Sequence, residues 1–472
     1  MTPEQIQELE PAFADYLQPF ADCCGCPATF HLLHVYCRGL LSDLPRKTAE
    51  PLALAAGTAV RTLQEFLKDH VWSRSAARDT LIEYTAGLLD RLPGDDLGTV
   101  GIVDETGVAK KGTKTPGVQR QWCGELGKKE NCIVTVHLGV AKGRFKTLLD
   151  ADLFLPESWD ADRDRCRQAE IPDHVVDRPK WQLAARQVLR ARALGVDLDW
   201  LTFDENYGSK PGFLRELDRQ HLAYVGEVPK SFACFTQPPR PGEAGHRADE
   251  LVRHSPVFHR QAAQPFALAR QTLGEQRWQA KSAPVWLRDD GEVLDGSHWL
   301  IWARHEHSGE EKYFIAAGAA GAPLGLRLRV GFARWNVEHG LRTSKGEIGL
   351  RHFEGRSYVG LMRHLQLCLI TLTFAAERAA ALRGEKSGGD DRAGLPGAEL
   401  DQRGVAGRTA ADDPAAEHLG QHSLPPTAQS GGAGVQAAPQ PRTACGIHAT
   451  CGALDAPPQT NPAPEYPVAV AL

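Results

Sequence analysis

The spacing of apolar and polar residues divides the chain into regions of different period. Up to about residue 95 the apolar positions recur every three or four residues, as at Leu63, Phe66 and Leu67, which is typical of packed helices. The pattern then changes to short runs rich in β-branched residues between Gly- and Lys-rich turns. These runs predict three antiparallel strands at 98–106, 131–141 and 144–156.

Helical and strand-like patterns alternate beyond these strands. Helices are predicted at 181–195, which ends at Gly195, and at 210–220, with strands at 199–208 and 221–229. Short Trp-rich strands follow to about residue 318. Long helices return at 329–350 and 357–384.

This order predicts an α/β protein in five parts. The succession β-β-β-α-β-α-β is the topology of a ribonuclease-H-like core, here interrupted by a β-rich insertion and preceded by an all-α domain. Beyond about 385 the chain is rich in Gly, Ala, Pro and Ser without periodicity, so this tail is expected to be disordered. The predicted limits are 1–95 for the helical domain, 96–228 for the first part of the core, 229–318 for the insertion, 319–384 for the closing helices and 385–472 for the tail.

Composition narrows the class of protein. A chain of 472 residues exceeds one typical core, so several domains are expected. Its 11 cysteines are scattered, and no basic-then-apolar leader opens the sequence, so we expect a cytoplasmic protein with reduced thiols. No run was found that approaches the roughly 20 apolar residues of a membrane-spanning helix. The formal net charge of −5 excludes a uniformly basic surface but leaves room for local basic grooves.

Three acidic residues stand where such a core places metal ligands. Asp104 ends the first predicted strand, Asp204 ends the fourth, which should lie beside the first, and Glu338 lies on the helix 329–350. Carboxylate oxygens suit the Mg²⁺ or Mn²⁺ ions of two-metal phosphoryl transfer. Each acid alone is more simply explained as a turn former, a cap or half of an ion pair. Only the three together predict a metal site.

Basic residues near these acids predict phosphate contacts. Arg334 and Lys345 lie four residues before and seven residues after Glu338, so one helical face should present a carboxylate between two cations. Lys110 and Lys111 follow the first acid closely. These four basic residues are therefore predicted to grip the DNA backbone.

Other local motifs favour structural roles. The spacing of Cys24, Cys26, His31 and His34 is not that of a common zinc module, and helical packing explains them better. The run GVAKKGTK lacks the Gly-Lys-Ser/Thr ending of a phosphate-binding loop, and no Gly-x-Ser-x-Gly elbow occurs. The residues beside the two aspartates are interpreted first as turn formers: Glu105, Glu205, Asn206 and Tyr207.

Three blocks of the sequence resemble the catalytic blocks of the IS701-type branch of the IS4-like DDE transposases. They begin VDETGVAKKGTKT, TFDENYGSKPGF and RWNVEHGLRTSKGEIGL, and the likeness extends over roughly residues 10 to 380. In the wider family the third block is Tyr, two residues, Arg, three residues, catalytic Glu, six residues, Lys. Arg334, Glu338 and Lys345 keep this spacing, whereas Gly331 stands at the Tyr position.

The resemblance implies a transposase that cleaves DNA at insertion-sequence ends and joins the freed 3′-OH to target DNA. It implies Asp104, Asp204 and Glu338 as the catalytic metal ligands, with Mg²⁺ or Mn²⁺ as cofactor. The expected partners are double-stranded DNA, from the terminal repeats and the target, and a second copy of the chain in a homodimer. No membrane partner is expected, and a bacterial, nucleoid-associated protein is implied. Residues 1–95, which include Arg46 and Lys47, are predicted to bind the element ends.

Two other functions stay open. The tail also reads like GC-rich DNA translated in a shifted frame, which would make the chain a catalytically silent or decayed derivative that binds the same ends without cutting. A stand-alone structure-specific nuclease of the same fold is disfavoured, because such an enzyme needs neither the helical domain nor the insertion.

Overall fold

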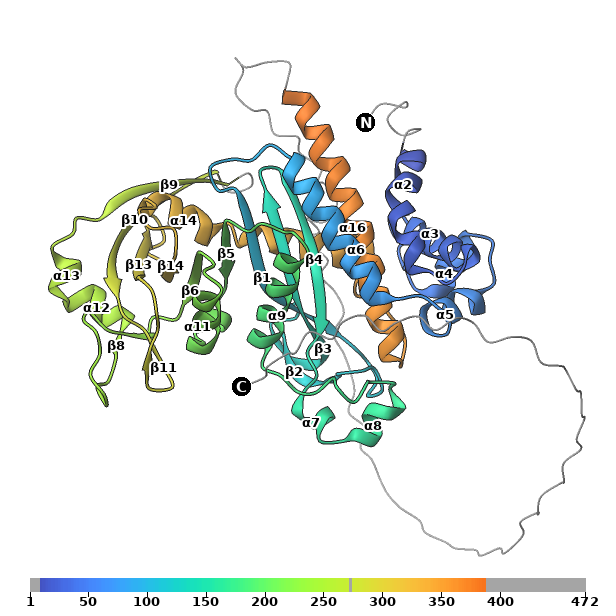
Figure 1. Cartoon of the computed structure of the whole chain (residues 1–472), viewed down its shortest axis with the longest axis horizontal. Coiled ribbons are helices and arrows are strands. Elements are labelled where there is room, and N and C mark those ends of the chain that lie inside the picture. The colour runs from blue at the N-terminus through green and yellow to red at the C-terminus, as the bar shows by residue number, and fades with distance from the viewer. Residues whose placement is uncertain (1–8, 271–273, 388–472) are drawn as a thin grey trace, which may run out of the picture. The chain divides into compact units, whose positions relative to one another are not determined.

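A ten-stranded mixed sheet organises the described residues, which are 9–270 and 274–387 of the computed structural model (Figure 1). The strands run in the order β2-β3-β1-β5-β6-β14-β13-β10-β9, and β4 pairs with β3. In chain order they are β1 (Thr99–Ala109), β2 (Gln119–Cys123), β3 (Lys128–Lys142), β4 (Phe145–Leu153), β5 (Trp200–Phe203), β6 (Tyr224–Val228), β9 (Gln264–Arg270), β10 (Gly274–Val285), β13 (His298–His305) and β14 (Glu311–Ala317). Two short ribbons lie outside this sheet, β7 (Ala233–Cys234) with β8 (His246–Arg247) and β11 (Arg288–Asp289) with β12 (Glu292–Val293).

The strands β1, β5 and β6 pair in parallel, and β3 and β4 continue the sheet antiparallel on the other side of β1. Val103 and Leu138 point to the face covered by α9 (Lys180–Ala193) and α11 (Pro211–Arg219). Ile102 points to the opposite face, against later helices. Burial on both faces explains why these strands are almost continuously apolar. The prediction of an α/β protein is confirmed.

Helices cover the sheet at several points and form the first part of the chain. Those before the sheet are α2 (Leu9–Leu17), a 3-10 helix (Gln18–Cys23), α3 (Pro27–Leu41), α4 (Ala49–Ala55), α5 (Val60–Lys68) and α6 (Arg74–Arg91). The short helices within the sheet region are α7 (Glu157–Asp160), α8 (Arg163–Gln168), α10 (Glu205–Gly208), α12 (Ala248–His254) and α13 (Pro256–His259). The closing elements are α14 (Leu324–Phe332), α15 (Trp335–Thr343), the π-helix η2 (Ser344–Ile348) and α16 (Tyr358–Ser387).

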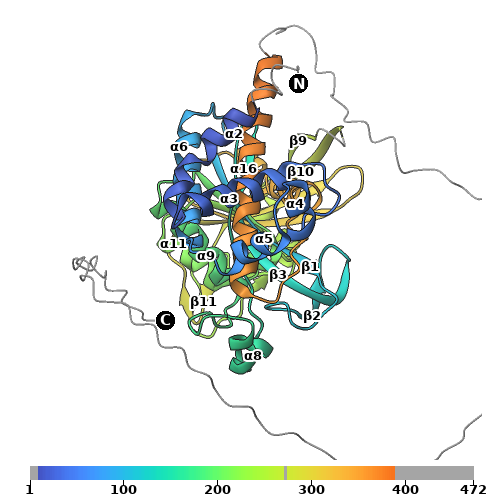
Figure 2. The same cartoon turned by 90° about the vertical axis from the view of Figure 1, so that its right-hand side faces the viewer.

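The helix α16 ties the first helices to the sheet. It belongs to the same hydrophobic cluster as Phe13, Leu33 and Phe66 of the first helices, near which it runs in Figure 2, and it also contacts β4. The Tyr16 hydroxyl donates a 2.7 Å hydrogen bond to the carbonyl oxygen of Ile370, and the Tyr36 hydroxyl lies 2.9 Å from Nδ1 of His364. The helical segment therefore shares one core with the closing helix, while the five-part division stays a prediction.

The sequence expectation about membrane-spanning segments needs a correction at α16. Residues Tyr358–Leu382 are long and apolar enough to cross a membrane, with a mean hydropathy of 1.4 over the best window. However, 83% of that window is buried inside the protein. Its apolar residues pack against the sheet and the first helices, so α16 is explained as a core helix.

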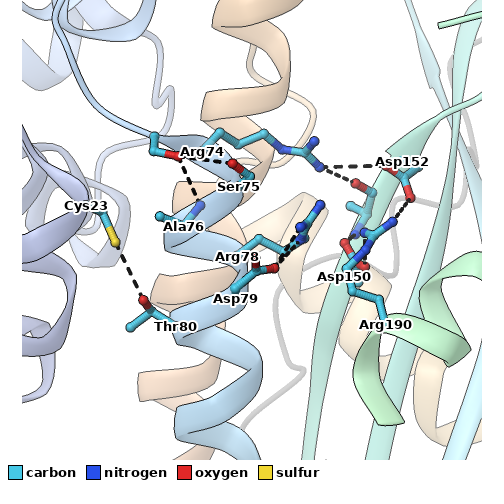
Figure 3. A network of polar contacts seen from close by, with 12 residues as sticks. Cys23, Arg74, Ser75, Ala76, Arg78, Asp79, Thr80, Asp150, Asp152 and Arg190 are labelled. Carbon is cyan, nitrogen blue, oxygen red and sulfur yellow. Dashed lines mark hydrogen bonds and ion pairs between the residues drawn. The ribbon is translucent and has the colours of Figure 1, made fainter. Parts of the chain in front are cut away.

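A buried network of charges fastens α6 to the sheet beneath it (Figure 3). Arg190 on α9 pairs with Asp150 and Asp152 of β4, and Arg74 of α6 donates a 2.8 Å hydrogen bond to the carbonyl oxygen of Ala151. Burial, followed by the neighbouring Asp152, raises the pKa of Asp150 to about 6. Because removing one partner would leave a buried charge uncompensated, this network fixes where α6 meets the sheet.

Several predicted elements differ from the structure in instructive ways. The region of three predicted strands contains four, because β2 is a short edge strand whose two apolar residues, Trp122 and Cys123, are adjacent and so show no apolar alternation. The insertion contains the helices α12 and α13 besides strands, and its strands join the main sheet through the antiparallel pair β6 and β14. The predicted disordered tail lies outside the described residues.

Candidate active site

The two aspartates lie next to each other on adjacent parallel strands. The register of β1 and β5 pairs Val103 with Phe203, so Asp104 is the next residue on β1 and Asp204 is the first residue after β5. Asp104 was expected to end its strand, but β1 continues through Ala109. Asp204 directly follows β5 and is the N-cap of α10, where its Oδ1 accepts a 3.0 Å hydrogen bond from the Asn206 amide. Capping and catalysis are therefore compatible roles for Asp204.

The third acid, Glu338, reaches this pair through Arg334. The guanidinium group of Arg334 lies 3.4 Å from Oδ2 of Asp104 and 2.9 Å from Oε1 of Glu338. Its side chain is only 18% exposed, against 33% for Glu338. The structure therefore brings Asp104, Asp204, Arg334 and Glu338 together, with the cation between the acids rather than on a separate phosphate-facing surface.

The sequence pattern predicts one continuous helix at 329–350, but in the structure this helix is interrupted before Glu338. Residues 333–334 separate α14 from α15, and the bonds there run from residue i to i+3: the Val337 amide donates to the carbonyl oxygen of Arg334 over 3.1 Å. Apolar residues continue at helical spacing through this break, so the sequence pattern gives no sign of it. Val337 and Leu341 hold α15 on the sheet, and a Cβ atom on Gly139 of β3 would lie 3.1 Å from Val337.

Gly331, which stands at the family's Tyr position, is buried on α14. A Cβ atom there would lie 3.0 Å from the Phe314 ring and 3.2 Å from Val225. A side chain as large as tyrosine does not fit this packing without displacing both neighbours. The glycine in place of the family's tyrosine therefore allows α14 to pack closely against the sheet.

The end of the helix that carries Glu338 and the residues just after it are contacted by groups from three other parts of the chain. The ammonium group of Lys47 donates hydrogen bonds to the carbonyl oxygens of Leu40, over 2.7 Å, and Glu347. The ammonium group of Lys110 donates to the carbonyl oxygen of Phe353 over 2.6 Å, and His364 lies 3.1 Å from the carbonyl oxygen of Gly349. The contacts to Glu347 and Gly349 satisfy carbonyl groups that the end of η2 leaves without partners, whereas Leu40 lies near the end of α3 and Phe353 lies in the segment after η2.

The two basic clusters predicted to contact DNA, Lys110 with Lys111 and Arg46 with Lys47, each supply one of these residues, and their role at DNA stays a prediction. Burial lowers the pKa of Lys110 to about 8, and its amine is engaged by main-chain oxygens rather than exposed. Lys47 is buried, and Arg46 pairs with Glu354. Lys111 is exposed beside Lys110, and Lys345 is half-buried on η2. Because η2 is a π-helix, Lys345 does not continue the straight face expected seven residues after Glu338.

Some residues around the acids were not identified from the sequence. Glu105 was interpreted as a turn former, but it lies inside β1, pairs with Lys180 at 2.5 Å and accepts a 3.3 Å hydrogen bond from the Tyr207 hydroxyl. His137 of β3 faces Asp104 in the strand register and is buried. Burial lowers its pKa to about 4; the nearby Asp152 opposes this shift, and Lys345 adds to it. Only the strand register, which the sequence pattern leaves open, could have placed His137 here.

The electrostatics of the acids favour a bound cation. Burial, followed by repulsion from Asp204, raises the pKa of Asp104 to about 7 although Arg334 opposes the shift. Burial also raises the pKa of Asp204, again opposed by Arg334. Within the described residues, no group of three or more His, Cys, Asp or Glu side chains is arranged to hold a metal ion. The donor set nevertheless fits hard divalent ions, since it consists of carboxylates that already attract one cation, Arg334.

Comparison with known proteins extends this picture. Residues 19–285 match the family model described as DDE superfamily endonuclease. The matched segment includes Asp104 and Asp204 and ends before Glu338. The chain is also 28% identical over 333 residues to a protein of Microchaete diplosiphon described as a probable transposase for insertion sequence element IS701. That alignment covers 70% of this chain and 77% of the relative.

Proposed function

Because the chain belongs to the DDE superfamily endonuclease family, we propose that it is a transposase that cleaves DNA at the ends of its insertion sequence and joins the 3′-OH to target DNA. The observation that carries the proposal is the in-register pair of Asp104 and Asp204 on parallel strands, with Glu338 joined to Asp104 through Arg334. The order β4-β3-β1-β5-β6 supports a ribonuclease-H-like core around them.

The acids would hold Mg²⁺ or Mn²⁺, and such ions activate an attacking water or 3′-OH and stabilise the leaving oxygen. Asp104 and Asp204 are supported by rigid strands, and α15 is packed on the same sheet, so the three carboxylates are preorganised. Arg334 is placed to exchange its carboxylate partners for a phosphate of the bound strand. Lys345 and Lys111 supply further positive charge for the DNA backbone.

The proposed partners follow from this chemistry. Double-stranded DNA of the element ends binds beside the acids, and the target DNA joins the same centre for strand transfer. The active complex is proposed to be a homodimer, and a bacterial chromosome places the protein in the cytoplasm. The helical residues 9–91 are proposed to contribute to end binding, although Lys47 acts inside the protein rather than on its surface.

A strand-transfer assay tests this function. Purified full-length chain is incubated with labelled duplexes from the ends of the element that encodes it and with a supercoiled target plasmid, in Mg²⁺ or in EDTA. The proposal predicts end-specific nicks and joined products in Mg²⁺ and none in EDTA. End-specific binding without any product would instead identify the catalytically silent derivative, and cleavage in EDTA would contradict the metal mechanism.

A further inference from the structure

A two-stranded ribbon formed by β2 and the start of β3 presents an exposed tryptophan between cations. Trp122 is 60% exposed although it belongs to a strand. The register pairs Trp122 with Lys129 and Arg120 with Asn131, and paired residues of antiparallel strands point to the same side. Arg120, Trp122 and Lys129 therefore share the outer face of the ribbon, which we call the ribbon surface. Arg120 and Lys129 are both exposed.

The inner face of the ribbon is packed and explains its position. Cys123, Cys132 and Val134 form a small buried cluster with Phe154 against it. The ribbon folds closely over β1, because a Cβ atom on Gly107 would lie only 3.2 Å from the Cα atom of Cys123. The outer residues consequently stand on a supported strand pair rather than on a loose loop.

The ribbon lies close to the catalytic acids along two connections. Gly107, which the ribbon covers, is three residues beyond Asp104 on β1, a span of about 10 Å. At the ribbon's turn, Glu125 pairs with Arg351, which follows the catalytic helix, over 3.2 Å. In Figure 2 the strands around β2 are drawn to the right of α5 and are not overlapped by the helices in front of the sheet.

The charges of the ribbon surface favour a polyanion. The two acids of the ribbon are neutralised, since Glu125 pairs with Arg351 and Glu130 with Lys128. Among residues 9–270 and 274–387, Arg120 and Lys129 have no ion-pair partner. Lys111 adds a further exposed cation, because the Asn131 amide donates to the carbonyl oxygens of Lys110 and Gly112 and holds that loop beside the ribbon. An aromatic ring among cations is the pattern that binds unpaired nucleotides by stacking and phosphate contact.

We infer that the ribbon surface binds the DNA strand next to the cut, with Trp122 stacked on an unpaired base and Arg120 and Lys129 on its phosphates. This inference rests on the proposed function and identifies a contact outside the catalytic acids. It commits the surface to DNA, whereas a second copy of the chain is the alternative occupant that the experiment must exclude.

Binding of two probes separates these possibilities. One probe is a blunt duplex from an element end, and the other has the same sequence with several unpaired nucleotides at the cleavage position. Trp122→Ala should bind the unpaired probe about 5- to 150-fold more weakly than wild type, the range expected for one stacked base, and the duplex with little change. Trp122→Phe should restore most of the loss. The double variant Arg120→Ala/Lys129→Ala should weaken both probes and lower the salt slope of binding by about two.

The matched controls change exposed residues that are distant in sequence from the ribbon surface. Val293→Ala replaces another exposed apolar residue, and Arg219→Ala/Arg260→Ala removes two exposed arginines. Thermal unfolding must show that every variant folds as the wild type does. If Trp122→Ala binds both probes within twofold of wild type, or if it changes the oligomeric state without DNA, the inference is overturned.

The measurements also separate this inference from the proposed function. A wild-type protein that binds through the ribbon surface but never cuts would contradict the transposase proposal alone. A wild type that cuts normally, together with a Trp122→Ala variant that binds and cuts as well, would contradict the ribbon inference alone.

Discussion

Replacing Asp104 by Asn tests the electrostatic account of the paired aspartates. Burial and Asp204 raise the pKa of Asp104 to about 7 in the folded protein, whereas an unfolded Asp titrates near about 3.9. The folded state therefore retains a proton that the unfolded chain releases. The stability linked to this group is fully present below about pH 4 and is lost as the pH rises through about 7.

The size of the effect follows from the shift. Three pKa units correspond to about 4 kcal/mol, of which about 2 to 3 kcal/mol fall between pH 5 and pH 8. These values are upper limits, because relaxation of the site and water entry reduce the cost of burying a charge. An amide at this position stays neutral and keeps the oxygen that accepts the 2.7 Å hydrogen bond from the Glu105 amide.

The assay is urea denaturation at pH 5 and pH 8 in EDTA, for wild type and Asp104→Asn. Between these pH values the wild type should lose about 2 to 3 kcal/mol more unfolding free energy than the variant. Groups such as Asp150 titrate in both proteins, so the difference between the two pH dependences isolates Asp104. Asp173→Asn, which changes a carboxylate that is 87% exposed, is the control. Parallel pH dependences for wild type and Asp104→Asn would refute the reasoning.

Three further predictions concern the surroundings of the acids. Lys47→Met should lower the unfolding free energy by about 2 to 4 kcal/mol, because two buried carbonyl groups lose their donor. Arg61→Met, at an 86% exposed side chain, is the control. Equal stability of the two variants would show that the hydrogen bonds of Lys47 do not stabilise the fold. Arg334→Ala and Lys345→Ala should each lower the salt slope of DNA binding by about one, as measured by filter binding, and unchanged slopes would argue against phosphate contacts. Mg²⁺ or Mn²⁺ should support cleavage while Ca²⁺ supports binding only, and equal cleavage in Ca²⁺ would contradict octahedral oxygen sites.

Much of the core could be predicted from the sequence because its elements are strongly patterned. The strands β1 and β5 contain apolar runs that lead up to Asp104 and Asp204, and their parallel pairing follows from the helix α9 between them. The polar edge strand β2 escaped, since its side chains face solvent or a small local cluster rather than the main core. The short helices α12 and α13 of the insertion were missed for a different reason: they have too few residues to show a helical period.

The limits of the sequence are clearest at the site itself. Spacing placed Arg334 four residues from Glu338, and their ion pair is observed, but spacing did not show that Arg334 also reaches Asp104. Lys110 and Lys47 look like surface cations in the sequence, yet Lys47 donates to the carbonyl oxygen of Glu347 on η2, and Lys110 donates to that of Phe353 in the segment that follows. These roles depend on contacts between residues more than 200 positions apart, which no local pattern records.

The most direct test of the central claim is a paired measurement on Glu338→Gln, which concerns the acid that lies outside the family match. Binding and strand cleavage are measured on the same labelled end fragment in Mg²⁺, with wild type alongside and folding verified by thermal unfolding. Removing one carboxylate weakens a metal site while it lessens repulsion towards phosphates. The account predicts a variant that binds DNA at least as tightly as wild type and yields no cleavage product. Cleavage by Glu338→Gln at the wild-type rate would remove Glu338 from the catalytic centre and contradict the three-acid account.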